Sequence, residues 1–104
     1  MQIVFEQEYL ADLYYHQTSD KKHRFQPDVI KKYTKVVNIL KFAKSVRDLM
    51  PFNSLRYEKL LGDKQGIESV RVTDKYRLEF RTESLGEDVT VTVCNIIELS
   101  NHYQ

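Results

Sequence analysis

The clearest structural signal in this chain is the run from residue 62 to 80, which reads Gly62-Asp63-Lys64-Gln65-Gly66-Ile67-Glu68-Ser69-Val70-Arg71-Val72-Thr73-Asp74-Lys75-Tyr76-Arg77-Leu78-Glu79-Phe80. A polar turn bounded by two glycines leads into two segments in which apolar and polar residues alternate. Alternation with a period of two predicts β-strands that place one face on the core. Each strand carries an arginine, Arg71 or Arg77, opposite its apolar residues, so the sheet is suited to holding a phosphate backbone.

The flanking sequence extends this sheet and adds helices. Alternating apolar residues between Val89 and Leu99 continue an antiparallel sheet, and Ile3-Val4-Phe5 predicts an opening strand. Helical spacing predicts one helix over about residues 7–16 and a second from Pro27, whose apolar stripe is Val29, Ile30, Tyr33, Val36, Val37 and Leu40. We therefore expect an α+β fold in which an N-terminal strand and two helices pack with an antiparallel sheet formed mainly by the C-terminal half.

Length and composition fit one small domain over residues 1–104, with 41% hydrophobic residues to form a core. The single cysteine, Cys94, excludes an internal disulfide, and its apolar strand predicts a buried, inert thiol. No apolar run approaches the roughly 20 residues of a membrane span, and no signal peptide is recognisable. We therefore expect a cytoplasmic protein without a membrane partner.

The charges are unevenly distributed, although the net charge is only +1. Residues 1–20 contain no lysine or arginine, whereas residues 21–47 are rich in both. Such a block is often a solvated helix face, but within a small domain it also favours a polyanionic partner. The candidates for binding RNA or the ribosome are Lys21, Lys22, Arg24, Lys31, Lys32 and Lys35, together with Arg56, Lys59 and Lys64 near the two strands.

Several kinds of chemistry are excluded by the motifs that are missing. The three glycines do not form a phosphate-binding loop, and the histidines and the cysteine lack the spacing of a zinc site. The acidic residues are scattered rather than clustered as a metal-dependent nuclease requires. We expect no metal and no cofactor.

The residues that remain for chemistry are Arg71, Arg77, His102 and Tyr103. Cleaving RNA without a metal requires a base for the 2′-hydroxyl, a cation for the charge developing on phosphorus, and an acid for the leaving 5′-oxygen. Histidine suits acid–base work near neutral pH, and tyrosine can stack on an unpaired base. The structural alternative pairs the arginines across the sheet with Glu68 or Glu79 and leaves the terminal His-Tyr as a solvated tail.

The segment from Leu60 to Phe80 resembles the HigB branch of the RelE/ParE toxin superfamily. Members typically carry a leucine, then Gly-Asp-basic-x-Gly, then Ser-hydrophobic-x-Val, then aromatic-Arg-hydrophobic-x-Phe. The matching residues here are Leu60, Gly62-Asp63-Lys64-Gln65-Gly66, Ser69-Val70-Arg71-Val72 and Tyr76-Arg77-Leu78-Glu79-Phe80. The end of the chain, from Ile97 to Tyr103, is similar to the family's closing strand with its acidic, aromatic and histidine residues.

This resemblance implies a type II toxin that enters the ribosomal A site and cuts translated mRNA without a metal, and a cognate helix-turn-helix (HigA-like) antitoxin that neutralises it. Arg77 matches the family arginine after the aromatic residue, and His102 and Tyr103 match the terminal pair in swapped order. Two departures are Glu58, where relatives often have a histidine, and Asn101, which replaces a terminal acid. Glu58 is a further candidate base, provided that it is desolvated.

Two other functions remain open. A ParE-like toxin would bind a protein target such as DNA gyrase without cutting RNA, which the missing upstream histidine favours. A member whose catalysis has decayed would bind RNA or the ribosome and leave transcripts intact.

Overall fold

The computed structural model describes residues 1–86 and 91–101. The main elements are β1 (Gln2–Phe5), α1 (Glu8–Tyr15), α2 (Pro27–Phe42), β2 (Glu58–Lys59), β3 (Glu68–Arg71), β4 (Arg77–Leu85) and β5 (Val91–Ser100). The connection from α2 to β3 also contains the 3-10 helices Val46–Leu49, Asn53–Leu55 and Gly62–Lys64. The predicted order of strand, two helices and sheet is confirmed, with β2 as an addition that the sequence pattern did not indicate.

The sheet has the strand order β1-β5-β4-β3-β2. Its centre is the long antiparallel pair β4–β5, in which Arg77 lies opposite Ser100 and Leu85 opposite Val91. β1 pairs with β5 in parallel, so the sheet is mixed, whereas an antiparallel sheet was expected. No short turn connects β1 to β5, and the direction of β1 is therefore set by tertiary packing rather than by local sequence.

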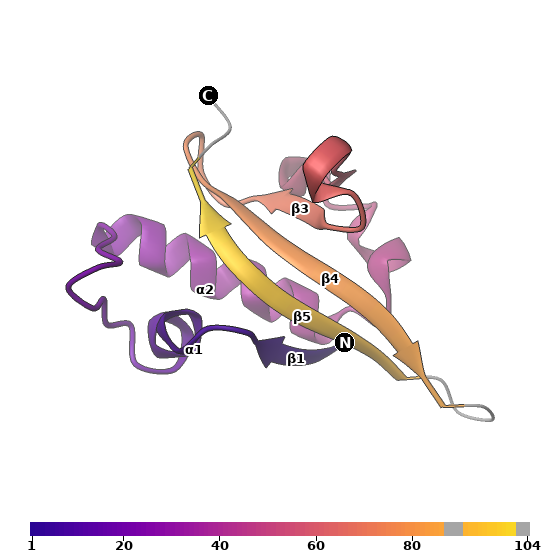
Figure 1. Cartoon of the computed structure of the whole chain (residues 1–104), viewed down its shortest axis with the longest axis horizontal. Coiled ribbons are helices and arrows are strands. Elements are labelled where there is room, and N and C mark those ends of the chain that lie inside the picture. Colours follow the sequence, from indigo (N-terminus) through magenta and orange to yellow (C-terminus); the bar gives the residue numbers. More distant parts are fainter. Residues whose placement is uncertain (87–90, 102–104) are drawn as a thin grey trace.

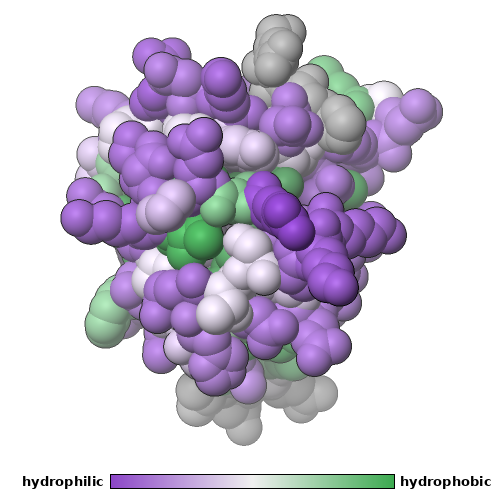
Figure 2. Space-filling view, turned by 90° about the vertical axis from the view of Figure 1, so that its left-hand side faces the viewer, coloured by the Kyte–Doolittle hydropathy of each residue, from purple (hydrophilic) through white to green (hydrophobic). Residues whose placement is uncertain are grey.

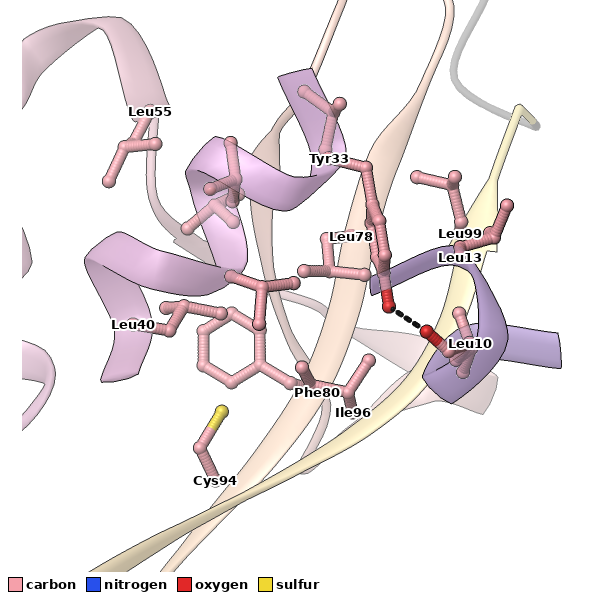
Figure 3. Packing of buried hydrophobic residues seen from close by; sticks show 14 of the residues in the cluster. Leu10, Leu13, Tyr33, Leu40, Leu55, Leu78, Phe80, Cys94, Ile96 and Leu99 are labelled. Carbon is pink, nitrogen blue, oxygen red and sulfur yellow. Dashed lines mark hydrogen bonds between the residues drawn. The ribbon is translucent and has the colours of Figure 1, made fainter. Parts of the chain in front are cut away.

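Both helices cover the same face of the sheet (Figure 1). All six residues of the predicted α2 stripe are buried, and they pack with Leu10 and Leu13 of α1 and with Leu78, Phe80 and Ile96 of the sheet (Figure 3). Tyr33 is fully buried, and its hydroxyl donates to the backbone carbonyl of Leu10 at 2.7 Å. This hydrogen bond fixes α2 against α1, and burial raises the pKa of Tyr33 far above its ordinary range.

Cys94 is fully buried in the same core, as the apolar strand predicted. Burial raises the pKa of its thiol to about 12, and the nearby Glu68 carboxylate contributes in the same direction. The thiolate needed for nucleophilic chemistry is therefore strongly disfavoured in the folded protein.

Candidate functional site

The candidate site lies on the sheet face opposite the helices. Strand register aligns four residues of β2 to β5 in one row: Glu58, Ser69, Glu79 and Glu98. Two positions along, a second row consists of Arg71, Arg77 and Ser100. Because alternate residues of a strand share a face, the side chains of both rows leave the sheet on the same side.

Arg77 is the central residue of this face. Its Nε donates to Ser69 Oγ at 2.9 Å, and its Nη2 donates to the carbonyl oxygens of Arg56 at 2.5 Å and of Ser69 at 3.3 Å. The Glu58 carboxylate lies 3.6 Å from Nε. These contacts fix the plane of the guanidinium, and only 12% of the side chain is exposed. The open sheet surface that the alternation predicted is therefore largely covered at this position.

The cover over Arg77 comes from the segment that leads into β2. Arg56 adopts the left-handed conformation, with φ 44 and ψ 54, and its carbonyl accepts the hydrogen bond from Arg77. Glu58 follows two residues later and is 51% exposed. Glu58 is therefore close to Arg77, but it is half-exposed and lacks the desolvated surroundings that a role as base was expected to require.

Lys64 also covers this face, where its ammonium lies 2.8 Å from the carboxylate of Glu79. Glu79 is 2% exposed, whereas Lys64 is 41% exposed. The turn that places Lys64 here begins at Gly62 and ends at Gly66, with φ angles of +66° and +90° that favour glycine. The glycine motif of the sequence thus positions a counter-ion for a buried carboxylate.

Glu68 lies on the other side of β3, with Val70 and Phe80. Its carboxylate accepts hydrogen bonds from the Tyr57 hydroxyl and from Thr82 Oγ1, the latter at 2.8 Å. Burial, together with the hydrogen bond to Glu68, raises the pKa of Tyr57 well above its ordinary range. Glu68 consequently faces away from both arginines, so the structural alternative is wrong where it pairs them with Glu68.

Arg71 is the register partner of Arg77, but its guanidinium turns towards the β3–β4 turn and pairs with Asp74. There it lines a cleft of about 510 Å³ together with residues of α2 and of the segment before it. The two strand arginines are therefore adjacent in the backbone but directed to different surroundings.

The other predicted RNA-binding residues are divided between two parts of the structure. One group is exposed on α2 and on the segment between α1 and α2: Lys21, Lys22, Arg24, Lys31, Lys32 and Lys35. Arg56 and Lys59 are exposed beside β2, on the edge of the sheet. His102 and Tyr103 lie outside the described residues.

The sequence matches the HigB-like toxin family, described as the RelE-like toxin of the type II toxin-antitoxin system HigB, over residues 3–93. This chain belongs to the HigB-like toxin family. The family match thus covers Arg77, Glu58 and both glycines of the turn, and it ends before the closing residues of β5.

Solved structures share the fold of this HigB-like toxin. A YoeB/ParE toxin from Agrobacterium tumefaciens is 22% identical, with a TM-score of 0.56 over 99% of this chain and 100% of that chain. A YoeB-YefM complex from Staphylococcus aureus contains a chain that is 18% identical, with a TM-score of 0.57 over 99% of this chain and 98% of that one. No curated protein sequence shows significant similarity to this chain.

Sequence reasoning overlooked two residues of this face in the HigB-like toxin. Ser69 is fully buried and holds Arg77, and Glu98 stands next to Glu79 in the row across the strands. Alternate residues of a strand share a face, so the sequence already placed Ser69 on the same side of β3 as Arg71. Pairing β3 with β4 in the correct register would have identified Ser69 as a neighbour of Arg77. Glu98 could be placed only once the irregularity between Glu79 and Phe80 was known.

The described part of the chain contains no group of three or more His, Cys, Asp or Glu side chains arranged to hold a metal ion. Within the same residues, no helix is both long and apolar enough to cross a membrane.

Proposed function

We propose that this HigB-like toxin is a metal-independent endoribonuclease that cuts mRNA on the ribosome and so inhibits translation in the cytoplasm. The observation that carries the proposal is the setting of Arg77, whose guanidinium is held by Ser69 and Arg56 in register with Ser100 near the end of β5. His102 follows Ser100 by two residues and Tyr103 by three. This short connection supports a shared role of Arg77, His102 and Tyr103 at one phosphodiester.

The proposed reaction forms a bond between the 2′-oxygen of a ribose and the adjacent phosphorus, and breaks the bond from phosphorus to the 5′-oxygen of the next nucleotide. Arg77 contacts the non-bridging oxygens and stabilises the charge that develops there. One member of the set His102, Tyr103 and Glu58 takes the proton of the 2′-hydroxyl, and another donates a proton to the 5′-oxygen. The short distance between Glu58 and Arg77 supports including this carboxylate in the set.

A cognate antitoxin is the second proposed partner. Type II systems pair a toxin with an antitoxin, and one of the similar structures is a YoeB-YefM complex. We expect a helix-turn-helix protein whose acidic or amphipathic element neutralises the lysine-rich α2 and covers Arg71 and Arg77. If these charges dominate the contact, binding weakens steeply as salt is added.

The test compares parent and variants by primer extension on cellular mRNA after induced expression, and on purified translating ribosomes in the presence of a chelator. The parent should cut mRNA, and His102→Ala should reduce cutting by about 10²-fold or more. His16→Ala, which changes an exposed histidine after α1, is the matched control and should cut like the parent.

Two results would overturn the proposal. Intact transcripts combined with inhibition of gyrase supercoiling would support a ParE-like toxin. Ribosome binding by the parent without any cut transcript would support a decayed RNA-binding module.

A further inference from the structure

A basic cleft lies between the start of α2 and the β3–β4 turn. Its volume is about 510 Å³, and its lining includes four cationic side chains, from Arg24, Lys32, Arg71 and Lys75, together with Gln26 and Tyr76. The two acidic residues in the lining are Asp28 and Asp74. This side of the molecule is mostly hydrophilic, with an apolar area near the centre of the view and smaller ones towards its edges (Figure 2).

The segment that carries Arg24 into this cleft is held in place by packing. The ring of His23 stacks on Tyr9 with a centroid distance of 3.8 Å and an interplanar angle of 4°. Phe25 packs edge-on against Tyr76 at 5.4 Å, which joins this segment to the β3–β4 turn. The cleft walls are therefore preorganised, so a ligand does not have to order them.

The cations of the cleft are available to a ligand to different degrees. Asp74 already pairs with Arg71. Among the described residues, no ion pair involves Arg24, Lys32 or Lys75, and all three are exposed. Asp28 is the one acidic residue of the lining besides Asp74, and the positive end of the α2 dipole lies nearby at Pro27. The cleft therefore attracts anions.

The cleft lies at the same end of β3 and β4 as Arg77. Arg71, in the cleft wall, is the direct cross-strand partner of Arg77, so the two backbones are about 5 Å apart. The two guanidinium groups are directed to different surroundings, so a strand of RNA that binds at Arg77 would have to pass around the β3–β4 turn to enter the cleft. Tyr76, which also lines the cleft, offers an aromatic ring beside the cations for an unpaired base.

We propose that the basic cleft binds the phosphodiester backbone of single-stranded substrate RNA next to the phosphate at Arg77, a role that rests on the endoribonuclease function proposed above. Arg24 and Lys75 contact backbone phosphates from opposite walls, and Asp28 weakens the binding by repulsion. The cleft thus sets how firmly the flanking nucleotides are held and does not take part in breaking the bond.

The test measures binding of a short 2′-O-methylated single-stranded RNA, which cannot be cut through its 2′-oxygen, by fluorescence anisotropy over a range of salt. The plot of log affinity against log salt has a negative slope, and each lost phosphate contact should make it shallower by about 0.7. Arg24→Gln combined with Lys75→Gln should therefore bind more weakly, with a slope shallower by about 1.4. Asp28→Asn should bind more tightly than the parent.

The matched control is Lys41→Gln, which removes an exposed lysine at the other end of α2 and should bind RNA like the parent. The inference is overturned if the double variant binds this RNA like Lys41→Gln, or if Asp28→Asn brings no gain. It is also overturned if the double variant loses affinity for a poly-glutamate peptide to the same extent, because the cleft is then a general anion site.

The inference and the proposed function fail separately. If the parent binds RNA through the cleft but leaves mRNA uncut on translating ribosomes, the endoribonuclease proposal is wrong and the binding site stands. If the parent cuts mRNA and the cleft variants bind RNA unchanged, the binding site alone is wrong.

Discussion

Replacing Arg77 by lysine tests the reasoning on the site most directly, because Arg77→Lys keeps the charge and removes the shape of the guanidinium. In the structure one guanidinium donates at the same time to Ser69 Oγ and to the carbonyl of Arg56. A single ammonium on a flexible stem cannot reproduce this geometry. The variant should therefore lose at least one charge-assisted hydrogen bond and the fixed orientation of the cation.

The two consequences have different expected sizes. A hydrogen bond to a charged group contributes about 1.5–3 kcal/mol, and we expect the free energy of unfolding to fall by about 2 kcal/mol. For a domain of this size that loss lowers Tm by about 10 °C. Loss of one donor that stabilises charge in a transition state costs about 10²–10³-fold in rate, so mRNA cleavage should fall by at least about 10²-fold.

Denaturant unfolding measures the first quantity, and primer extension on translating ribosomes, at a temperature where the variant is folded, measures the second. Ser69→Ala is the informative companion, because it leaves Arg77 in place and removes only the partner of Nε. It should give a smaller loss of both stability and cleavage. An Arg77→Lys protein that unfolds like the parent and cuts at the parental rate would refute the account.

Three further predictions concern the buried polar groups. Tyr33→Phe removes the hydroxyl that donates to Leu10 and should lower the free energy of unfolding by about 1 kcal/mol, and an unchanged denaturation midpoint would contradict this. Lys64→Met removes the ammonium that pairs with the buried Glu79 and should lower the free energy of unfolding by about 2 kcal/mol. Adding Glu79→Gln in the same chain should restore part of this stability, and a double variant no more stable than Lys64→Met would count against the pairing. The raised pKa of Cys94 means that the folded protein holds the thiol proton to higher pH than the unfolded chain does. The stabilisation that this gives is complete below about pH 9 and is lost as pH rises towards about 12. By about pH 10 the free energy of unfolding of the parent should have fallen by about 1.4 kcal/mol more than that of Cys94→Ala, and equal pH dependence of unfolding in the two proteins would show this to be wrong.

Local patterns in the sequence were sufficient for most of the secondary structure. The α2 stripe predicted a helix and its buried face because helical spacing depends only on neighbouring residues. The alternation from Ser69 to Phe80 likewise predicted β3, β4 and the side on which both arginines leave the sheet. The glycine-bounded turn was also evident, because positive φ angles favour glycine whatever lies around them.

The surroundings of the arginines could not be predicted in this way. The carbonyl that accepts from Arg77 belongs to Arg56, which is 21 residues away in the chain, and the partner of Arg71 lies in the adjacent turn rather than across the sheet. The parallel direction of β1 beside β5 and the covering of Arg77 also arise from contacts between distant segments. Periodicity fixes which face a side chain takes, whereas its partners and exposure depend on strand register and on what packs over it, and only the folded chain brings these together.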